Sequence, residues 1–547
     1  MKQFSALKRQ TVLKSMESDV FDVLIIGGGI TGAGIALDAV TRGLKVALVE
    51  MQDFASGTSS RSTKLVHGGL RYLKQFEVKE VAELGRERAI VYENGPHVTT
   101  PEWMLLPFHE GGTFGKMTTS LGLKVYDLLA GVKKSERRKM LTKEETLKRA
   151  PIIKKDGLLG GGLYVEYRTD DARLTIEVLK AAFAKGAVIS NYAKADQFIY
   201  DENRKAVGAE VVDVLTEEQF SVKAKVIINA SGPWVDSLRE LDSSKMDKHL
   251  ILSKGVHLVF DQSVFPLSQS IYFDTPDGRM VFAIPRDGKT YVGTTDTFYE
   301  GNPKEMTITE EDRHYILKSI HYMFPELRVL EEDIESSWAG VRPLIHEKGK
   351  GPSEISRKDE IWESDSGLIT IAGGKLTGYR KMAQTVVDLA VRKLKEVEDG
   401  NFGPCITKKL PISGGDFGGS FKMRQFIKET VHQALQLGLN QKETAEIVKM
   451  YGTNARNVLS YVKHNGSALP DGLYARLMYA IHEEMAIKPA DFFVRRTGKL
   501  LFDISTVLEW KGEVVSVMAE TFKWTETERE KYSDELDQEI IIATIPQ

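Results

Sequence analysis

The sequence is poor in cysteine and has no long hydrophobic run. Cys405 is the single cysteine among 547 residues, which excludes an internal disulfide and any zinc or iron–sulfur site built from several cysteines. We therefore expect a reducing, cytoplasmic environment. The longest apolar run, Val23 to Leu37, has 15 residues and is rich in glycine, whereas a helix needs about 20 to span a bilayer. The sequence predicts a protein that is soluble or at most peripheral to a membrane.

The chain also lacks a charge excess, internal repeats and low-complexity segments. It has 74 Lys and Arg against 77 Asp and Glu, for a formal net charge of −3, so its overall charge predicts no nucleic-acid partner. At 547 residues it is too long for one hydrophobic core, because domains usually have about 100 to 200 residues. We expect about two to four domains.

The strongest local signal is a glycine-rich segment. Residues 21–50 read as a buried strand, a glycine turn, a helix and a second strand. Gly27, Gly29 and Gly32 form G-x-G-x-x-G, which allows a tight turn, a pyrophosphate at the helix N-terminus and close helix packing. Glu50 ends the second strand, where its carboxylate can accept hydrogen bonds from ribose hydroxyls. The segment predicts a dinucleotide site, with a structural βαβ turn as the alternative, and does not separate NAD from FAD.

Two later segments repeat the strand–turn–helix form. Residues 222–238 run into a sharp turn at Ala230 to Pro233, and residues 367–391 run through Gly373 and Gly374 into a helix. The first resembles the segment of two-dinucleotide-fold flavoproteins in which a strand returns beneath the cofactor. In the second, N–H groups at the start of the helix would face negative charge that develops on a flavin ring. Each turn alone could be an ordinary connection, but three in this order favour a flavoprotein.

The remaining segments predict a cap and a helical tail. Asp277-Gly278 and Asp287-Gly288 each stand between strand-like runs, a strong signal for β-hairpins. We expect a meander of antiparallel strands, inserted as a cap over the substrate. From about Lys408 onward the apolar residues follow a helical period, which predicts a further helical domain.

Motifs along nearly the whole chain resemble those of the flavin-dependent glycerol-3-phosphate dehydrogenases. They are DVLIIGGGITGAGIALDAVTRGLKVALVE, GTSSRSTKLVHGGLRYL, YRTDDARL, INASGPWVD, WAGVRPL, GGKLTGYRKMA and, in the tail, ARLMYAIHEEMAIKPADFFVRRT. Many flavoproteins share the glycine fingerprint, whereas HGGLRYL followed by DDARL and GVRPL is far more specific. The resemblance implies bound FAD, oxidation of sn-glycerol 3-phosphate to dihydroxyacetone phosphate, and electron delivery to a membrane quinone.

The resemblance also implies an α/β fold in three parts. We expect a two-dinucleotide-fold FAD-binding domain of the D-amino-acid-oxidase type at residues 18–96, 168–252 and 341–398. An antiparallel β cap domain is expected at residues 97–167 and 253–340, and an α-helical domain at residues 399–547.

The glycine turns and the loops beside them supply the predicted contacts with FAD, and no metal site is predicted. The predicted cofactor-binding residues are Gly27, Gly28, Gly29, Thr31, Gly32, Glu50, Ser59, Ser60, Lys64, Leu65, His67, Ser231, Gly232, Gly373, Gly374, Lys375, Leu376 and Thr377.

The phosphate of the substrate calls for fixed cations. It carries a charge of about −1.5 to −2, and the planar fork of arginine matches phosphate oxygens. Arg71, Arg342 and Arg357 are the predicted ligands. For Arg342 the alternative is a structural salt bridge, and for Arg71 it is an ion pair with an acid on its own helix. Tyr72 could donate its hydroxyl to the phosphate or simply belong to the core.

The oxidation removes a hydride from C2 and a proton from its hydroxyl, so a base must lie close to the reacting carbon. His67 is the predicted base because an imidazole titrates near pH ~6.5, with contact to the flavin alone as the alternative. His257, on a cap strand, is the second candidate and a predicted substrate ligand. Lys375 and Arg342 are predicted to hold negative charge on the flavin or the substrate, although Lys375 could be a surface lysine.

A membrane quinone requires a membrane-facing surface. Residues 114–134 place their apolar side chains on one stripe of a helix, and residues 133–149 carry eight Lys or Arg against three Glu. This combination fits an interfacial helix on the anionic inner face of the cell membrane. The alternative is a helix packed on its own domain, followed by a solvated basic tail.

Three other functions remain open. A glycerol-3-phosphate oxidase would pass its electrons to oxygen, but the family's oxidases carry an insertion before the last glycine turn, and only 32 residues separate Arg342 from Lys375. An amine or amino-acid oxidase would not need several arginines for a phosphate. The third is a flavin-binding scaffold without turnover. The sequence also leaves the oligomeric state open, a homodimer included.

Overall fold

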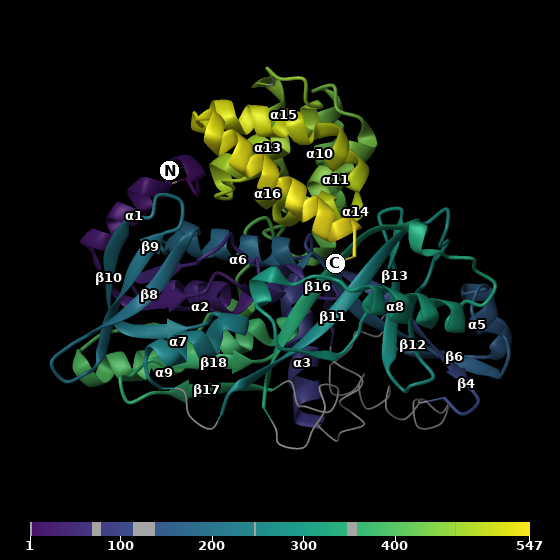
Figure 1. Ribbon diagram of the computed structural model, residues 1–547, viewed down its shortest axis with the longest axis horizontal. Helices are drawn as coiled ribbons and strands as arrows, with labels where there is room; N and C mark the ends of the chain where they lie inside the picture. Colours follow the sequence, from purple (N-terminus) through teal and green to yellow (C-terminus); the bar gives the residue numbers. More distant parts are fainter. Residues whose placement is uncertain are drawn as a thin grey trace.

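The computed structural model describes residues 3–67, 78–112, 137–244, 248–346, 358–464 and 466–546. Two β-sheets lie next to each other, and the helices of the C-terminal part lie across them (Figure 1). No helix in these ranges is long and apolar enough to cross a membrane. The helix predicted over residues 114–134 lies outside the described residues.

The first sheet has eight strands and carries the predicted dinucleotide fold. Its order is β17-β18-β10-β1-β2-β7, and β8 and β9 extend it from β10. The strands are β1 (Val20–Ile26), β2 (Val46–Val49), β7 (Val188–Ser190), β8 (Ala193–Tyr200), β9 (Ala206–Asp213), β10 (Gln219–Asn229), β17 (Asp359–Glu363) and β18 (Ile369–Gly373). Strand β1 is parallel to both β2 and β10, and β10 is parallel to β18. The three predicted glycine turns therefore follow neighbouring strands and meet at one edge of the sheet.

Three helices cover one face of this sheet. Helix α2 (Ile30–Thr41) packs against α6 (Asp171–Ala184) and α9 (Tyr379–Val397). Strands β1 and β2 are buried almost throughout, so they read as nearly continuous apolar runs in the sequence. The N-terminal helix α1 (Arg9–Ser18) packs near β7 and β10.

The second sheet has ten strands and forms the cap. Its order is β15-β11-β14-β13-β12-β4-β6-β3, with β16 beside β11 and β5 beside β6. The strands are β3 (Leu65–Val66), β4 (Thr99–His109), β5 (Lys139–Leu141), β6 (Leu158–Thr169), β11 (Leu250–Asp261), β12 (Ser270–Asp274), β13 (Met280–Arg286), β14 (Lys289–Gly293), β15 (Thr297–Tyr299) and β16 (Ile334–Ile345). Both predicted hairpins are present, with Gly278 at φ +79° and Asp287-Gly288 at φ +51° and +84°.

The cap departs from the predicted antiparallel meander at one pair. Strand β4 runs parallel to β12, which is possible because no tight turn connects them. The predicted boundary between residues 340 and 341 falls inside β16, which pairs with β11 along its whole length. Strand β3, predicted to lie in the FAD-binding domain, also pairs with β6 of the cap sheet.

Other helices complete the cap and the tail. Four described helices connect the strands: α3 (Val78–Asn94), α5 (Lys143–Arg149), α7 (Val235–Leu241) and α8 (Glu310–Met323). The predicted helical tail contains α10 (Met423–Leu435), α11 (Gln441–Tyr451), α12 (Ala455–Ser460), α13 (Asp471–Glu483), the π-helical turn η13 (Asp491–Arg496), α14 (Lys499–Phe502), α15 (Ile504–Phe522) and α16 (Glu526–Thr544). Carbonyl oxygens of Leu501 and Ala543 accept hydrogen bonds from Ser336 and Ser337 of β16, so the tail is fastened to the cap sheet.

Candidate functional site

The first glycine turn is shaped so closely that side chains do not fit. Gly27 has φ +118°, and a Cβ there would lie 2.5 Å from the carbonyl oxygen of Ala230 at the end of β10. A Cβ on Gly32, in α2, would lie 1.9 Å from the carbonyl oxygen of Gly27. Both distances are far below van der Waals contact, so the predicted roles of these glycines in the turn and in helix packing agree with the structure.

Glu50 is held against this turn. One of its carboxylate oxygens accepts the N–H of Gly28 at 2.7 Å, and the other accepts the N–H of Gln52 at 2.8 Å. Burial raises the pKa of the Glu50 carboxyl, although these two hydrogen bonds oppose the shift. Each oxygen keeps a lone pair for a further donor, such as a ribose hydroxyl.

A serine-rich turn lies over the start of α2. Ser59, in the 3₁₀ turn η2 (Thr58–Ser60), accepts the N–H of Ile30 at 2.9 Å. Thr58 donates to the carbonyl of Val341 at 2.7 Å. A Cβ on Gly340 would lie 2.3 Å from the carbonyl oxygen of Arg61, so a glycine is needed there for β16 to approach the turn. The turn thus ties the nucleotide-binding sheet to the strand that carries Arg342.

The last glycine turn brings the predicted base to the nucleotide-binding sheet. Gly373 and Gly374 both have positive φ, +73° and +86°. The hydroxyl of Thr377, in η8 (Leu376–Gly378), accepts the N–H of His67 at 3.0 Å and donates to its carbonyl oxygen at 2.9 Å. His67 is therefore fastened through its backbone to the turn that carries Lys375.

These elements enclose one cavity with a volume of about 690 Å³. It reaches from Glu50 and the first glycine turn to the cap strands, and a volume of this size is typical of cofactor and ligand sites. The predicted residues among its lining are Gly27, Gly29, Thr31, Glu50, Ser59, Leu65, His67, Ser231, Gly232, Arg342, Gly373, Gly374, Lys375, Leu376 and Thr377.

Arg342 points its guanidinium across the cap sheet at the far end of the cavity. It donates to Thr294 Oγ1 at 2.7 Å and lies 3.2 Å from Asp296 Oδ1. A Cβ on Gly255, which faces Gly340 across β11 and β16, would lie 2.2 Å from a guanidinium nitrogen. Arg342 thus lines the cavity and also has an acidic partner that holds it in place. Its role as a phosphate ligand stays a prediction.

Glu166 is a cavity residue that the sequence analysis missed. It lies on β6, is 2% exposed and pairs with Arg88 at 2.9 Å. The register of β3 with β6 matches Val66 to Tyr167, and His67 and Glu166 are the next residues after this last pair. Glu166 and Tyr164 alternate along β6 immediately before DDARL and both line the cavity. That alternation is the signal that could have identified them.

Five predicted residues are not among the described residues that line the cavity: Gly28, Gly32, Ser60, Lys64 and His257. Gly28 and Gly32 pack closely within the turn, Gly28 against Glu50 and Gly32 against the carbonyl oxygen of Gly27. Lys64 is 3% exposed, and its ammonium binds Asp171 at 2.6 Å and the carbonyl of Ser60 at 2.9 Å. The structure thus places the Lys64 side chain in an internal ion pair, where it braces the serine-rich turn against α6.

His257 lies behind the cavity wall, where the sequence analysis expected a substrate ligand. Its ring is 1% exposed, stacks on Trp338 with centroids 4.6 Å apart, and contacts Thr63 Oγ1 at 3.0 Å. Burial, with the charges of Arg342 and Lys64, holds the pKa of His257 well below its usual value. Thr63 lines the cavity, so His257 contacts a lining residue but does not itself line the cavity. Of the other predicted substrate ligands, Arg71, Tyr72 and Arg357 lie outside the described residues.

Two family models match the chain. Residues 22–380 match the FAD dependent oxidoreductase family, and residues 405–529 match the C-terminal domain of alpha-glycerophosphate oxidase. The first match covers more than half of the chain and includes all three glycine turns and the cap strands. The second covers most of the helical tail.

Relatives are similar over the full length. An aerobic glycerol-3-phosphate dehydrogenase from Bacillus subtilis is 61% identical over 552 aligned residues, covering 100% of this chain and 99% of the relative. One from Staphylococcus aureus is 58% identical, covering 98% and 97%. A glycerol-3-phosphate dehydrogenase structure from Bacillus halodurans, complexed with FAD, is 49% identical with a TM-score of 0.87, covering 99% of each chain. The chain therefore belongs to the FAD-dependent oxidoreductases and, within them, to the family of the aerobic glycerol-3-phosphate dehydrogenases.

Proposed function

We propose that this chain oxidises sn-glycerol 3-phosphate to dihydroxyacetone phosphate with bound FAD and passes the electrons to a membrane quinone. The observation that carries the proposal is the continuous cavity, which the three glycine turns line together with Arg342, Lys375 and His67. The names of the full-length relatives support the substrate.

The residues at the first end of the cavity fit FAD. Helix α2 begins at the cavity, and its N-cap residue Gly29 has no side chain to compete with a phosphate. Gly27 keeps the floor of the turn free of side-chain atoms, and Glu50 offers carboxylate oxygens to ribose hydroxyls. When bound, FAD supplies the two-electron acceptor that amino-acid side chains lack.

At the other end, Arg342 binds the phosphate of the substrate. Asp296 and Thr294 hold its guanidinium in one orientation, so little side-chain entropy is lost when an anion arrives. A planar fork can donate two parallel hydrogen bonds to a phosphate, which a surface lysine cannot do.

His67 accepts the proton of the C2 hydroxyl. Thr377 fixes its backbone on both sides, and both His67 and Glu166 line the cavity. Lys375 lies at the turn between β18 and η8, where its ammonium stabilises negative charge on an oxygen in the cavity.

Anaerobic mixing tests the reaction. Addition of glycerol 3-phosphate to the purified yellow protein should bleach the flavin absorbance, and glycerol at the same concentration should not. If the flavin stays oxidised, the protein is a flavin-binding scaffold without turnover.

The electron acceptor is tested next on the reduced sample, which is divided between oxygen and a quinone analogue. Rapid reoxidation by the quinone alone supports the dehydrogenase, whereas rapid reoxidation by oxygen would make the protein an oxidase.

Delivery to a quinone requires the protein to reach the membrane surface. Five cations of the basic segment are described and exposed: Arg137, Lys139, Lys143, Lys148 and Arg149. Such a cluster is attracted to anionic lipids by about 1 kcal/mol per cation at the surface. Neutral substitutions of Lys133, Lys134, Arg137 and Arg138 should release the protein from sedimenting anionic vesicles. Unchanged sedimentation would contradict peripheral attachment to the inner face of the cell membrane.

That the protein forms a homodimer stays a prediction.

A further inference from the structure

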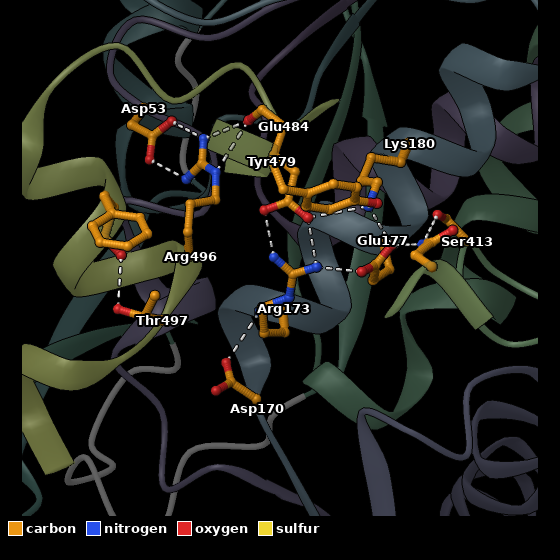
Figure 2. A network of polar contacts seen from close by, with 12 residues as sticks. Asp53, Asp170, Arg173, Glu177, Lys180, Ser413, Tyr479, Glu484, Arg496 and Thr497 are labelled. Atoms are coloured by element: carbon orange, nitrogen blue, oxygen red, sulfur yellow. Dashed lines mark hydrogen bonds and ion pairs between the residues drawn. The ribbon is translucent and has the colours of Figure 1, made fainter. Parts of the chain in front are cut away.

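Two buried charge clusters, linked by hydrogen bonds from Arg496 to the carbonyl oxygen of Glu484, join the C-terminal helices to α6 and to the segment after β2 (Figure 2). In one, cations of α6 bind Glu484, which follows α13. In the other, Arg495 and Arg496 of η13 bind Asp53. Asp53 lies three residues after Glu50, so this second cluster touches the segment that carries the ribose-binding acid.

Asp53 is enclosed by donors. Arg496 donates to both of its oxygens, at 2.7 and 2.8 Å, and Arg495 donates through Nε at 2.5 Å. Asn191 adds a fourth hydrogen bond at 2.9 Å. Burial opposes the charge of this carboxylate, which is 1% exposed, but the two guanidiniums hold the pKa of Asp53 well below its usual range. Asp53 is therefore a buried anion that depends on cations of the C-terminal part.

The segment around Asp53 closes over the first glycine turn. Glu50 accepts the N–H of Gly28, and five residues later the N–H of Ala55 donates to the carbonyl of Gly28 at 3.1 Å. Ala55 has φ +62°, a left-handed conformation that is unfavourable for a residue with a side chain. Other contacts must hold such a backbone in place. In this segment they are the backbone hydrogen bonds of Glu50 and Gln52 to residues 190–193 and the charged contacts of Asp53.

We propose that Arg495 and Arg496 are positioning residues for FAD, and that through Asp53 they keep residues 50–56 closed on Gly28 with Glu50 in reach of the ribose. Without a guanidinium, the carboxylate of Asp53 is a buried charge with too few partners, and it gains hydration if the segment opens. Opening moves Glu50 and Ala55 away from Gly28. The inference rests on the FAD site of the proposed function but not on its substrate or its final electron acceptor.

The first cluster supplies a matched control. Lys180 of α6 binds Glu484 at 3.1 Å, and Arg173 binds the same carboxylate at 2.7 Å. Lys180→Met and Arg495→Met each remove one of two buried cations from a carboxylate shared between the C-terminal part and the rest of the chain. Each also removes a cation from a second buried carboxylate, Glu177 for Lys180 and Asp491 for Arg495. Arg495→Met acts directly on the segment that holds Glu50, whereas Lys180→Met can reach that segment only through Arg496, which donates to the carbonyl oxygen of Glu484.

The experiment compares FAD release from the two holoenzyme variants. Dilution releases FAD, whose fluorescence rises in solution, and the amplitude and rate of that rise give the Kd and the release rate. Thermal unfolding gives the stability of each variant. We expect Arg495→Met to raise the Kd for FAD about tenfold, as is usual for coupled sites. Lys180→Met should lower the unfolding temperature about as much as Arg495→Met does, but its Kd for FAD should be unchanged.

Equal changes of the Kd in both variants would overturn the proposal, because the clusters would then only stabilise the fold. An unchanged Kd in Arg495→Met would overturn it as well. If Arg495→Met does not yield soluble protein, Arg495→Lys keeps the charge and weakens only the geometry. It should shift the Kd in the same direction, and no shift would overturn the proposal. Bleaching by glycerol 3-phosphate tests the proposed function separately on the same samples.

Discussion

The two ends of the cavity are built from different chemistry. At the cofactor end, the turns at Gly27 and Gly373 line the cavity with backbone and leave no room for side chains. At the substrate end, the groups that face the cavity are charged or titratable side chains, among them Arg342, Glu166 and His67. Shape should therefore control the first end and charge the second. A single added methyl group should break cofactor binding, whereas a change of charge should slow the reaction with FAD still bound.

The largest effect is expected from Gly32→Ala. The new Cβ would lie 1.9 Å from the carbonyl oxygen of Gly27, so α2 must move away from the turn that we propose receives the phosphates of FAD. We expect the purified protein to contain almost no FAD, as measured by the flavin absorbance relative to the protein absorbance.

Gly512→Ala is the control for that substitution. Gly512 also lies inside a helix, α15, but a Cβ there meets nothing within 4 Å. Alanine is a better helix former than glycine by about 1 kcal/mol, so this variant should keep its FAD and unfold at a slightly higher temperature. If Gly32→Ala also kept its FAD, shape would not control the cofactor end.

His67→Asn should break the substrate end with the cofactor still bound. Loss of a general base usually slows a reaction by about 10²- to 10⁴-fold, so flavin reduction by glycerol 3-phosphate should slow within that range in stopped-flow experiments at normal FAD content. His109→Asn is the control, because His109 lies on the same cap sheet and contacts the carbonyl of Lys154. A normal reduction rate in His67→Asn would leave His67 as a flavin contact only.

Arg342→Lys should have an intermediate effect. The lysine keeps the charge but loses the fork that Asp296 and Thr294 orient. Hydrogen bonds to charged groups contribute about 1.5–3 kcal/mol each, so kcat/KM for glycerol 3-phosphate should fall about 10- to 100-fold, mainly through KM. The slow reaction with glycerol, which has no phosphate, should change little. Equal losses for both substrates would argue against a phosphate contact.

The contrast between the two ends also explains what the sequence could predict. The glycine turns are local, since strand, turn and helix follow each other within about 30 residues, and each need for glycine arises from the backbone itself. The hairpins at Asp277 and Asp287 are local for the same reason. These predictions are confirmed by the strand pairings and by positive φ angles.

The substrate end depends on register between distant strands. Glu166 faces the cavity because β6 pairs with β3, about a hundred residues earlier in the chain. His257 was expected in the site, but the pairing of β11 with β16 sets it beside Trp338 and turns its ring into the core. The sequence did not predict the ion pair of Lys64 with Asp171, which fixes the Lys64 side chain. Sequence periodicity gives the face of a strand but not its neighbours, so these placements needed the structure.

Glu50 should give the smallest effect and one that depends on pH. Because burial raises the pKa of its carboxyl, the FAD-free fold favours the protonated form, and this contribution to stability is lost as the pH rises through that pKa. Ribose hydroxyls favour the ionised form, so FAD should bind more tightly above the pKa and more weakly as the pH falls through it. Titration of the Kd for FAD against pH should show this slope, and Glu50→Gln, which cannot ionise, should remove it at a cost of a few-fold in affinity. A slope that persists in Glu50→Gln would assign the titration to another group.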